Sequence, residues 1–309
     1  MAINTLEYAQ LLMTSLDEAA VRDMTTGWMD ANAGQVIYSG GNEVKIPKMS
    51  TQGMGNYDRD NGYAQGAITL AWETMQMTQD RGRKFQIDAM DVDETAFVPT
   101  AASLMGSFQR EKVVPEIDAY RLSKLATVAI GANVAGMVVY GQTIDGSSST
   151  LRKVKEGIKA VREQGYNGGI VIQANDTVVM ELQLELAGQL RSTTWSQGGI
   201  NTEVPVIDDA VIIPTPANRL YTAITLNDGT TSGQEAGGFA KGATGKDVNF
   251  IVLPRETPIA ITKQDVTRIF DPMTNQAANA WAIDYRRYHD LWVKDNRKGS
   301  IFVSVKDQA

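Results

Sequence analysis

The N-terminal residues carry apolar side chains at every fourth position. The stripe consists of Leu12, Leu16, Ala20, Met24 and Trp28. A spacing of four places these side chains on one face of an α-helix, so the pattern predicts a helix over 5–33. Gly34 follows at the place where helix C-termini favour glycine. Two interpretations fit this helix: an ordinary surface helix of its own domain, and a helical arm that docks on a neighbouring subunit.

The pattern changes to a two-residue period over 36–78. The alternating apolar positions are Val44, Ile46, Ile68, Leu70 and Trp72. Between them, residues 50–66 are rich in Gly, Asp and Asn, which favour turns and loops. The pattern therefore predicts two strands joined by a long polar tip. Such a two-stranded ribbon is marginal alone in water, so it needs a partner surface from its own domain or from another copy.

A charged stretch precedes the longest predicted helix. Its basic side chains are Arg81, Arg83 and Lys84, and its acidic ones are Asp88, Asp91, Asp93 and Glu94. Acidic side chains stabilise a helix N-terminus, and the apolar spacing that follows predicts a helix from about 100 to 129. Pro115 lies inside it, so we expect a kink near Val114. We also expect Arg81 and Arg83 to anchor the base of the ribbon through acidic partners.

Helices and strands alternate in the middle of the chain, which predicts a separate α/β layer over about 140–250. The predicted elements are a helix at 150–164, a strand at 168–173, a helix at 178–189 that Asn175 to Thr177 cap, and strands at 203–207 and 210–213. Glycine and small polar residues dominate 227–247, which is typical of a mobile surface loop. Further strands are predicted at 250–253, 258–262 and 300–305.

Composition and charge narrow the possible classes of protein. The 309 residues include 43% apolar residues, which is enough for a proper core. Lys and Arg number 29 against 36 Asp and Glu, a formal charge of −7, whereas nucleic-acid binders usually carry a basic footprint. Cysteine is absent, which excludes disulfides and cysteine nucleophiles. We find no secretory signal and no apolar stretch near the ~20 residues of a membrane span, so we expect a soluble protein made in the cytoplasm.

Candidate chemistry is sparse. His289 is the only histidine, and no Gly-x-Ser-x-Gly elbow accompanies it, so we expect it to be a packed residue. The pair Gly245 and Lys246 is followed by Asp247 where a phosphate loop needs Ser or Thr. The basic and aromatic stretch 285–290 fits subunit packing better than stacking on single-stranded nucleic acid. We therefore assign no catalytic, cofactor-binding or metal-binding residue, and keep as an alternative a soluble α/β enzyme with a carboxylate site at 88–94.

Two stretches of the chain carry a resemblance to a known family. One is residues 80–95 running into 109–126, and the other is 259–281 followed by 285–293. In order and spacing they are similar to the major capsid proteins of tailed bacteriophages, which have the Hong Kong 97-like fold. The resemblance implies an α+β fold, divided into an N-terminal arm at 1–33, an extended β-hairpin loop at 34–79, a peripheral domain at 80–139 and 250–309 with a spine helix at about 100–129, and an axial α/β domain at 140–249.

The resemblance also implies a function. Such proteins assemble as hexamers and pentamers into an icosahedral shell around double-stranded DNA. The expected partners are other copies of the chain, a separate scaffolding protein, a portal protein and packaged DNA bound without sequence specificity, with a decoration protein as a further candidate and no membrane. The expected location is the virion capsid, after assembly in the host cytoplasm. The shell of an encapsulin-like cellular nanocompartment is the alternative within the same fold.

An assembling subunit needs surfaces that reach its neighbours, and the arm and the ribbon are the features best suited to this. Charged and aromatic residues on these segments and near the ribbon base are the candidate intersubunit contacts. They are Trp28, Tyr57, Asp58, Arg59, Asp60, Arg81, Arg83, Asp91, Asp93, Glu94, Arg286 and Arg287.

Overall fold

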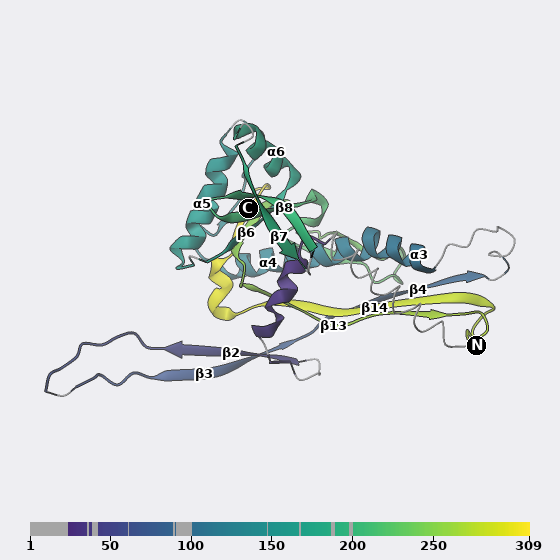
Figure 1. The fold of residues 1–309 in the computed structure, drawn as a ribbon, viewed down its shortest axis with the longest axis horizontal. Helices are drawn as coiled ribbons and strands as arrows, with labels where there is room; N and C mark the ends of the chain where they lie inside the picture. Colours follow the sequence, from purple (N-terminus) through teal and green to yellow (C-terminus); the bar gives the residue numbers. More distant parts are fainter. Residues whose placement is uncertain are drawn as a thin grey trace.

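The computed structural model has an elongated shape built from two sheets and a projecting ribbon (Figure 1). It describes residues 24–35, 37–38, 43–60, 62–88, 90, 101–146, 148–166, 168–186, 189–197 and 200–309. Most of the predicted N-terminal helix lies outside these residues, and so do Asp91, Asp93 and Glu94.

The larger sheet has seven strands in the order β5-β15-β12-β6-β9-β8-β7. Their bounds are β5 Val138–Val139, β6 Ile170–Asn175, β7 Arg191–Gln197, β8 Ile200–Ile207, β9 Ala210–Thr215, β12 Val248–Pro254 and β15 Phe302–Val305. The pairs β6 with β9 and β15 with β5 are parallel, and the other neighbours are antiparallel. Every residue of β6 and β12 is buried, as expected of strands covered on both faces.

Helices α5 (Thr150–Glu163) and α6 (Asp176–Glu185) cover one face of this sheet (Figure 1). The Ser149 side chain caps α5 by accepting from the Arg152 N–H at 3.1 Å, and Gly165 follows the helix with φ of +88°. The Asn175 side chain caps α6 in the same way, accepting from the Val178 N–H at 2.9 Å. Both helices therefore begin where the sequence predicts them.

The smaller sheet has three antiparallel strands in the order β13-β14-β4. Their bounds are β13 Pro258–Phe270, β14 Ala280–Val293 and β4 Gln79–Asp88. A long helix runs beside it as α3 (Ala101–Phe108), a π-helical turn η2 (Gln109–Val113) and α4 (Val114–Ala132). The π-turn lies directly before Pro115, at the place where we predicted a kink. The far end of α4 packs against the other face of the seven-stranded sheet, through Leu122 and Leu125.

The ribbon consists of β2 (Glu43–Thr51) and β3 (Ile68–Gln76), paired antiparallel as predicted, with the short strand β1 (Ile37–Tyr38) beside β2. It projects away from both sheets (Figure 1). The glycine-rich loop 227–247 follows β10 (Ile224–Leu226). It includes β11 (Phe239–Lys241), which pairs with β10 to form a hairpin. Short helical turns complete the fold: η1 Gly27–Gln35, η3 Ala217–Arg219 and η4 Asp295–Ser300.

The structure corrects two predictions. First, residues 250–309 do not form one region, because β12 and β15 belong to the seven-stranded sheet while β13 and β14 belong to the three-stranded one. Second, the described end of the predicted N-terminal helix is a 3-10 helix that continues through Gly34 to Gln35. The described part of the charged stretch up to Asp88 lies on β4, an element that we did not predict, and β4 pairs along its whole length with β14.

Candidate intersubunit surfaces

The two faces of the ribbon are apolar at different points along its length. Near the base, Val44 and Ile46 are fully buried and pack on Ile259, Tyr288 and Trp292 of the three-stranded sheet. Cross-strand partners share a face, so Met49 lies beside Leu70 on the opposite face, next to the pairs of Pro47 with Trp72 and Thr51 with Ile68. We call Met49, Ile68, Leu70 and Trp72 the ribbon stripe.

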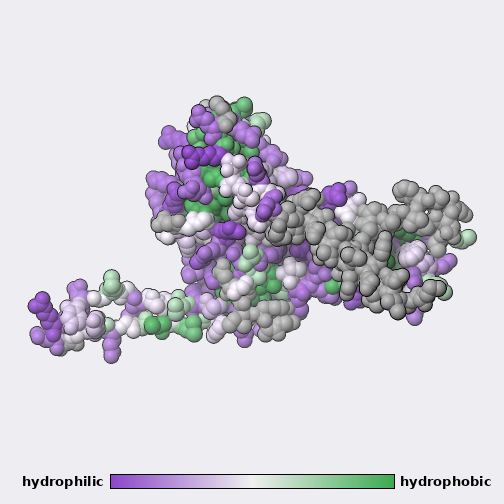
Figure 2. Space-filling view, viewed as in Figure 1, coloured by the Kyte–Doolittle hydropathy of each residue, from purple (hydrophilic) through white to green (hydrophobic). Residues whose placement is uncertain are grey.

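The ribbon stripe lies in water in the single chain. Ile68 is 72% exposed, Leu70 62% and Trp72 50%. Figure 2 shows the ribbon projecting from the rest of the chain, with apolar residues on its surface. Contiguous exposed apolar side chains of this size mark interaction sites in soluble proteins. The stripe therefore presents an apolar strip on the face that its own chain does not cover.

The tip of the ribbon carries four candidate contacts, Tyr57, Asp58, Arg59 and Asp60, and all four are exposed. The tip closes through Asp58 and Gly62, which exchange backbone hydrogen bonds of 3.1 and 2.8 Å. The ring of Tyr57 meets that of Tyr63 edge-on at 4.9 Å. The tip is thus an ordered polar turn, and a contact with another subunit remains a prediction for these residues.

Arg81 and Arg83 hold the glycine-rich loop to β4. Arg81 Nε and Nη2 donate to the two carboxylate oxygens of Glu116 on α4 at 2.7 and 3.1 Å, and its Nη1 donates to the Asn227 carbonyl at 2.8 Å. Arg83 donates to the Glu235 carbonyl through both terminal nitrogens at 3.1 Å. Arg81 therefore has an acidic partner, but Glu116 belongs to α4, and the Arg83 partner found here is a backbone carbonyl. These contacts join the two arginines to α4 and to the glycine-rich loop, whereas we predicted an anchor at the base of the ribbon.

These contacts attach the glycine-rich loop to the body of the chain, and its mobility stays a prediction. Gly229 and Gly237 have φ of +78° and +68°, and a Cβ added to them would lie 3.1 and 3.4 Å from Arg83 Nη1. Glycine at these positions lets the backbone approach the guanidinium group closely. Arg81 and Arg83, which we predicted as intersubunit contacts, thus have described partners within the chain.

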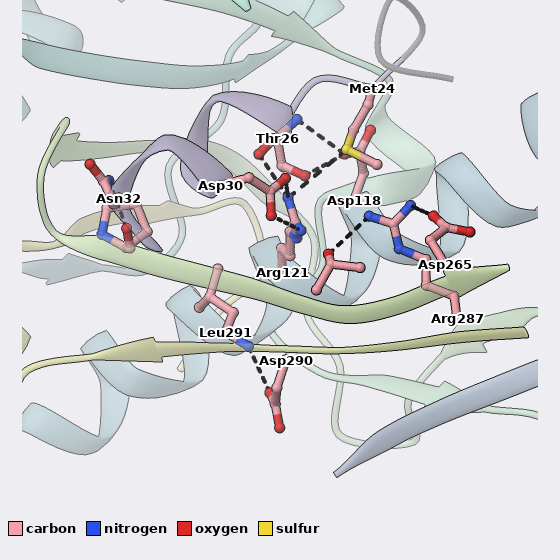
Figure 3. Close-up of polar contacts among 12 residues, drawn as sticks. Met24, Thr26, Asp30, Asn32, Asp118, Arg121, Asp265, Arg287, Asp290 and Leu291 are labelled. Atoms are coloured by element: carbon pink, nitrogen blue, oxygen red, sulfur yellow. Dashed lines mark hydrogen bonds and ion pairs between the residues drawn. The ribbon is translucent and has the colours of Figure 1, made fainter. Parts of the chain in front are cut away.

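The next pair of candidates, Arg286 and Arg287, points to opposite faces of β14. Arg286 forms an exposed ion pair with Asp80, with contacts of 2.8 and 2.5 Å, and this hydrogen bonding lowers the pKa of Asp80. Arg287 is 12% exposed and donates to Asp265 at 2.8 Å (Figure 3). Burial raises the pKa of Asp265, against the attraction of Arg287. Of the two arginines, Arg286 is the one that a neighbour can reach.

The segment 24–35 is fixed to its own chain by two buried charged groups. Asp118 on α4 accepts from the backbone N–H and hydroxyl of both Thr25 and Thr26 at 2.6 to 3.1 Å, and from Arg219 at 2.8 Å. Arg121 is fully buried and binds the Asp30 carboxylate at 2.8 and 3.0 Å (Figure 3).

Trp28 lies between these anchors, inside the core of its own chain. It is 2% exposed, and its ring meets Trp195 of β7 edge-on at 6.2 Å. A side chain in this position does not reach a neighbouring subunit. The prediction of Trp28 as an intersubunit contact is therefore wrong for this structure, although its burial agrees with the apolar stripe.

The single histidine is buried between cationic side chains. His289 is 5% exposed, its Nδ1 has no hydrogen-bond partner among the described residues, and its ring meets Tyr120 edge-on. Burial, together with the charges of Arg121, Arg287 and Arg81, lowers the pKa of His289 well below 6.5. The residue lines a cavity of about 740 Å³ between β4, η2 and the glycine-rich loop.

This environment predicts a pH dependence of stability. Below about pH 6.5 the unfolded chain binds a proton at His289 that the folded chain does not, so the free energy of unfolding falls as the pH falls, by ~1.4 kcal/mol per unit. His289→Gln removes this proton uptake. The free energy of unfolding of the variant should therefore change less between about pH 7 and about pH 5 than that of the unchanged chain. Urea unfolding of both proteins at each pH measures the difference. Parallel profiles would contradict the assignment.

No group of three His, Asp or Glu side chains among the described residues is arranged to hold a metal ion. The carboxylate site of the alternative enzyme hypothesis lies largely outside them, because Asp91, Asp93 and Glu94 are not described. No helix in the described part of the chain has the length and apolar character that a membrane crossing needs.

Comparisons with known proteins identify the fold. No protein-family model matches the chain, and no curated protein matches it by sequence. The structure of Mycobacterium phage Che8 matches with a TM-score of 0.55 over 87% of this chain and 86% of that one, at 14% identity. The mature capsid of bacteriophage PhiM1 matches at 0.58 over 86% and 82%, at 10% identity. The chain has the fold of tailed-phage major capsid proteins.

The predicted α+β, Hong Kong 97-like fold class is thereby confirmed. A virus-like particle from Pyrococcus furiosus shares this capsid fold, with a TM-score of 0.50 over 96% of this chain and 99% of that one, at 9% identity. Identities of 9 to 14% concern the fold and not the residues of a site. The capsid fold, the exposed ribbon stripe and the polar tip are the observations from which a function can be argued.

Proposed function

We propose that this chain is a major capsid protein, which assembles as hexamers and pentamers into an icosahedral shell around double-stranded DNA. The observation that carries the proposal is the ribbon stripe, an apolar strip that a chain with the capsid fold leaves in water. Burial of one large apolar side chain contributes ~1.5–3 kcal/mol. Three or four such side chains in every copy, repeated around closed rings of subunits, favour assembly.

The net charge of the chain fits a shell that encloses DNA without binding it tightly. The formal charge is −7, so the chain as a whole does not attract the phosphate backbone of DNA. We therefore propose that packaged DNA is enclosed without sequence-specific binding and that the role is structural and not catalytic. A scaffolding protein, a portal protein and a decoration protein are the proposed partners, with assembly in the host cytoplasm and the virion as the final location.

A shell of an encapsulin-like nanocompartment is the second candidate. It is supported by the similarity to the Pyrococcus furiosus virus-like particle, which extends over 96% of this chain. The two candidates differ in what the shell encloses. Purified particles that contain a co-purifying enzyme and no scaffolding protein or DNA would favour the nanocompartment.

Expression of the chain, alone and together with a candidate scaffolding protein, tests the proposal. We expect closed particles with five-fold and six-fold clusters of subunits, visible by electron cryomicroscopy. Light scattering measures the fraction of protein in particles. A chain that stays monomeric or forms only small oligomers under both conditions would contradict the proposed function.

A further inference from the structure

The ribbon joins the three-stranded sheet through two residues, Met77 and Thr78. They follow the end of β3 at Gln76 and precede the start of β4 at Gln79. In Figure 1 the ribbon and β4 extend in opposite directions from this junction. The direction of the ribbon therefore depends on what holds the backbone of these two residues.

Both residues of the junction are held by side chains of β14. Asp290 Oδ2 accepts from the Thr78 N–H and from the Thr78 hydroxyl, each at 2.9 Å. The Tyr288 hydroxyl donates to the Met77 carbonyl at 3.1 Å. The Asp290 carboxylate is fully buried, although Thr78 itself reaches the surface. Hydrogen bonds to a charged group are stronger than those between neutral groups, so this junction is strongly fixed.

The same carboxylate binds the long helix. Asp290 Oδ1 accepts from the Tyr120 hydroxyl of α4 at 2.6 Å, and Lys124, one turn further along α4, lies 3.5 Å from it. Burial and the charge of Asp290 raise the pKa of Tyr120, which keeps the phenol protonated as a donor. One buried carboxylate thus links the ribbon junction, β14 and the middle of α4.

A second polar interaction, a surface ion pair, also connects the ribbon to the rest of the chain, but it is weaker. Lys48 on β2 pairs with Asp295 at 3.2 Å and with Glu73 at 3.6 Å, and the Lys48 side chain is 41% exposed. Exposed pairs of this kind contribute little to stability, because water and salt screen their attraction. Of these two polar interactions the buried carboxylate is therefore the stronger one, and it acts together with the packing of Val44 and Ile46 on the three-stranded sheet.

We propose that Asp290 is a positioning residue, which fixes the direction of the ribbon and couples it to helix α4 through Tyr120. In the proposed function, on which this consequence rests, the coupling presents the ribbon stripe to the neighbouring subunit at a defined angle. Any change in the position of α4 relative to β14 must then break the contacts of Asp290 or move the ribbon with it.

The absence of cysteine makes the proposal directly measurable. Spin labels at Ser50→Cys on the ribbon and Lys159→Cys on α5 report the distance between ribbon and body by pulsed electron paramagnetic resonance. Labelled chain is diluted with unlabelled chain, so that only distances within one chain are recorded, whether or not shells form. We expect one narrow distance distribution in the otherwise unchanged chain and loss of that narrow distribution in Asp290→Asn.

Two further variants keep the test decisive. Asp295→Asn removes the exposed pair with Lys48 and should leave the distribution narrow. Tyr120→Phe keeps the ring in place and removes only the hydroxyl that links α4 to Asp290, so it should broaden the distribution even if Asp290→Asn does not fold. Circular dichroism checks folding. An unchanged narrow distribution in folded Asp290→Asn, or in Tyr120→Phe where the first variant is unfolded, would overturn the proposal.

The proposed function and the positioning role can fail separately. A narrow ribbon distribution in a chain that never forms shells would contradict the capsid proposal and leave the role of Asp290 intact. A broad distribution in the unchanged chain would contradict the role of Asp290, whatever particles it forms.

Discussion

The double variant Leu70→Asp and Trp72→Asp will remain folded and soluble but will not form shells. Both side chains are at least half exposed in the single chain, so their replacement should change the free energy of unfolding by only about 0.5 kcal/mol. In a shell, each lost apolar contact removes ~1.5–3 kcal/mol per copy. Each new carboxylate would also have to be desolvated against an apolar partner surface. Light scattering and electron microscopy measure the loss of particles.

The matched control places the same charges on the other face of the same strand. Thr69 and Ala71 are exposed and alternate with Leu70 and Trp72. We expect Thr69→Asp with Ala71→Asp to retain most of the particle yield. Normal shells from the Leu70 and Trp72 variant would show that the ribbon stripe is not an assembly surface, and equal loss from both variants would show that charge on the ribbon is sufficient.

Hydrophobic alternation predicted both strands of the ribbon, but it did not predict which apolar side chains are buried. Val44 and Ile46 lie on the sheet of their own chain, whereas Leu70 and Trp72 are in water. All four occupy the same kind of alternating position in the sequence. Their difference arises because Val44 and Ile46 point to the face of the ribbon that packs on the three-stranded sheet, whereas Leu70 and Trp72 point to the opposite face. The alternation in the sequence does not show which face the rest of the chain covers.

The segment 24–35 shows how a distant residue changes an element. The spacing of Met24 and Trp28 correctly indicated buried positions. The predicted helix does not continue through Thr25 and Thr26, because Asp118 takes their backbone N–H groups, which a helix would need for its own ladder. Asp118 lies more than ninety positions away along the chain, so no local pattern could reveal this competition.

The candidate contacts on β4 and β14 show that the partners of charged residues are hard to predict from sequence. Residues 80–84 have no apolar alternation, because Arg81 faces Glu116 and Asp80 faces Arg286 across the sheet. From the sequence, the nearby acidic group at 88–94 was the expected source of partners for Arg81, but the partner in the structure is Glu116 of α4. The Asp290 link to the ribbon junction was missed for the same reason, because Asp290 is one of several charged residues in β14 and nothing in the local sequence sets it apart.

Replacement of Asp118 by alanine should produce the largest loss of stability in this chain. The carboxylate is fully buried and accepts from four groups of Thr25 and Thr26 as well as from Arg219. Removal of one partner from a buried ion pair costs ~3–5 kcal/mol, because the remaining groups lose their partners without regaining water. We expect a decrease of about 3 kcal/mol or more in the free energy of urea unfolding, since Arg219 retains some contact with solvent.

The loss of stability in Asp118→Ala should begin at the segment 24–35. This local origin distinguishes it from a general disruption of the core. Without Asp118 the segment 24–35 keeps the pair of Arg121 with Asp30 and the bonds to the carbonyls of Thr25 and Thr26, but the N–H and hydroxyl groups of these threonines lose their acceptor. Limited proteolysis should therefore cut first near these threonines in the variant and not in the unchanged chain. Glu156→Ala, which removes an exposed pair with Arg152 on α5, is the control and should change stability by less than ~0.5 kcal/mol. A decrease below ~1 kcal/mol for Asp118→Ala would mean that the buried carboxylate does not hold this segment to α4.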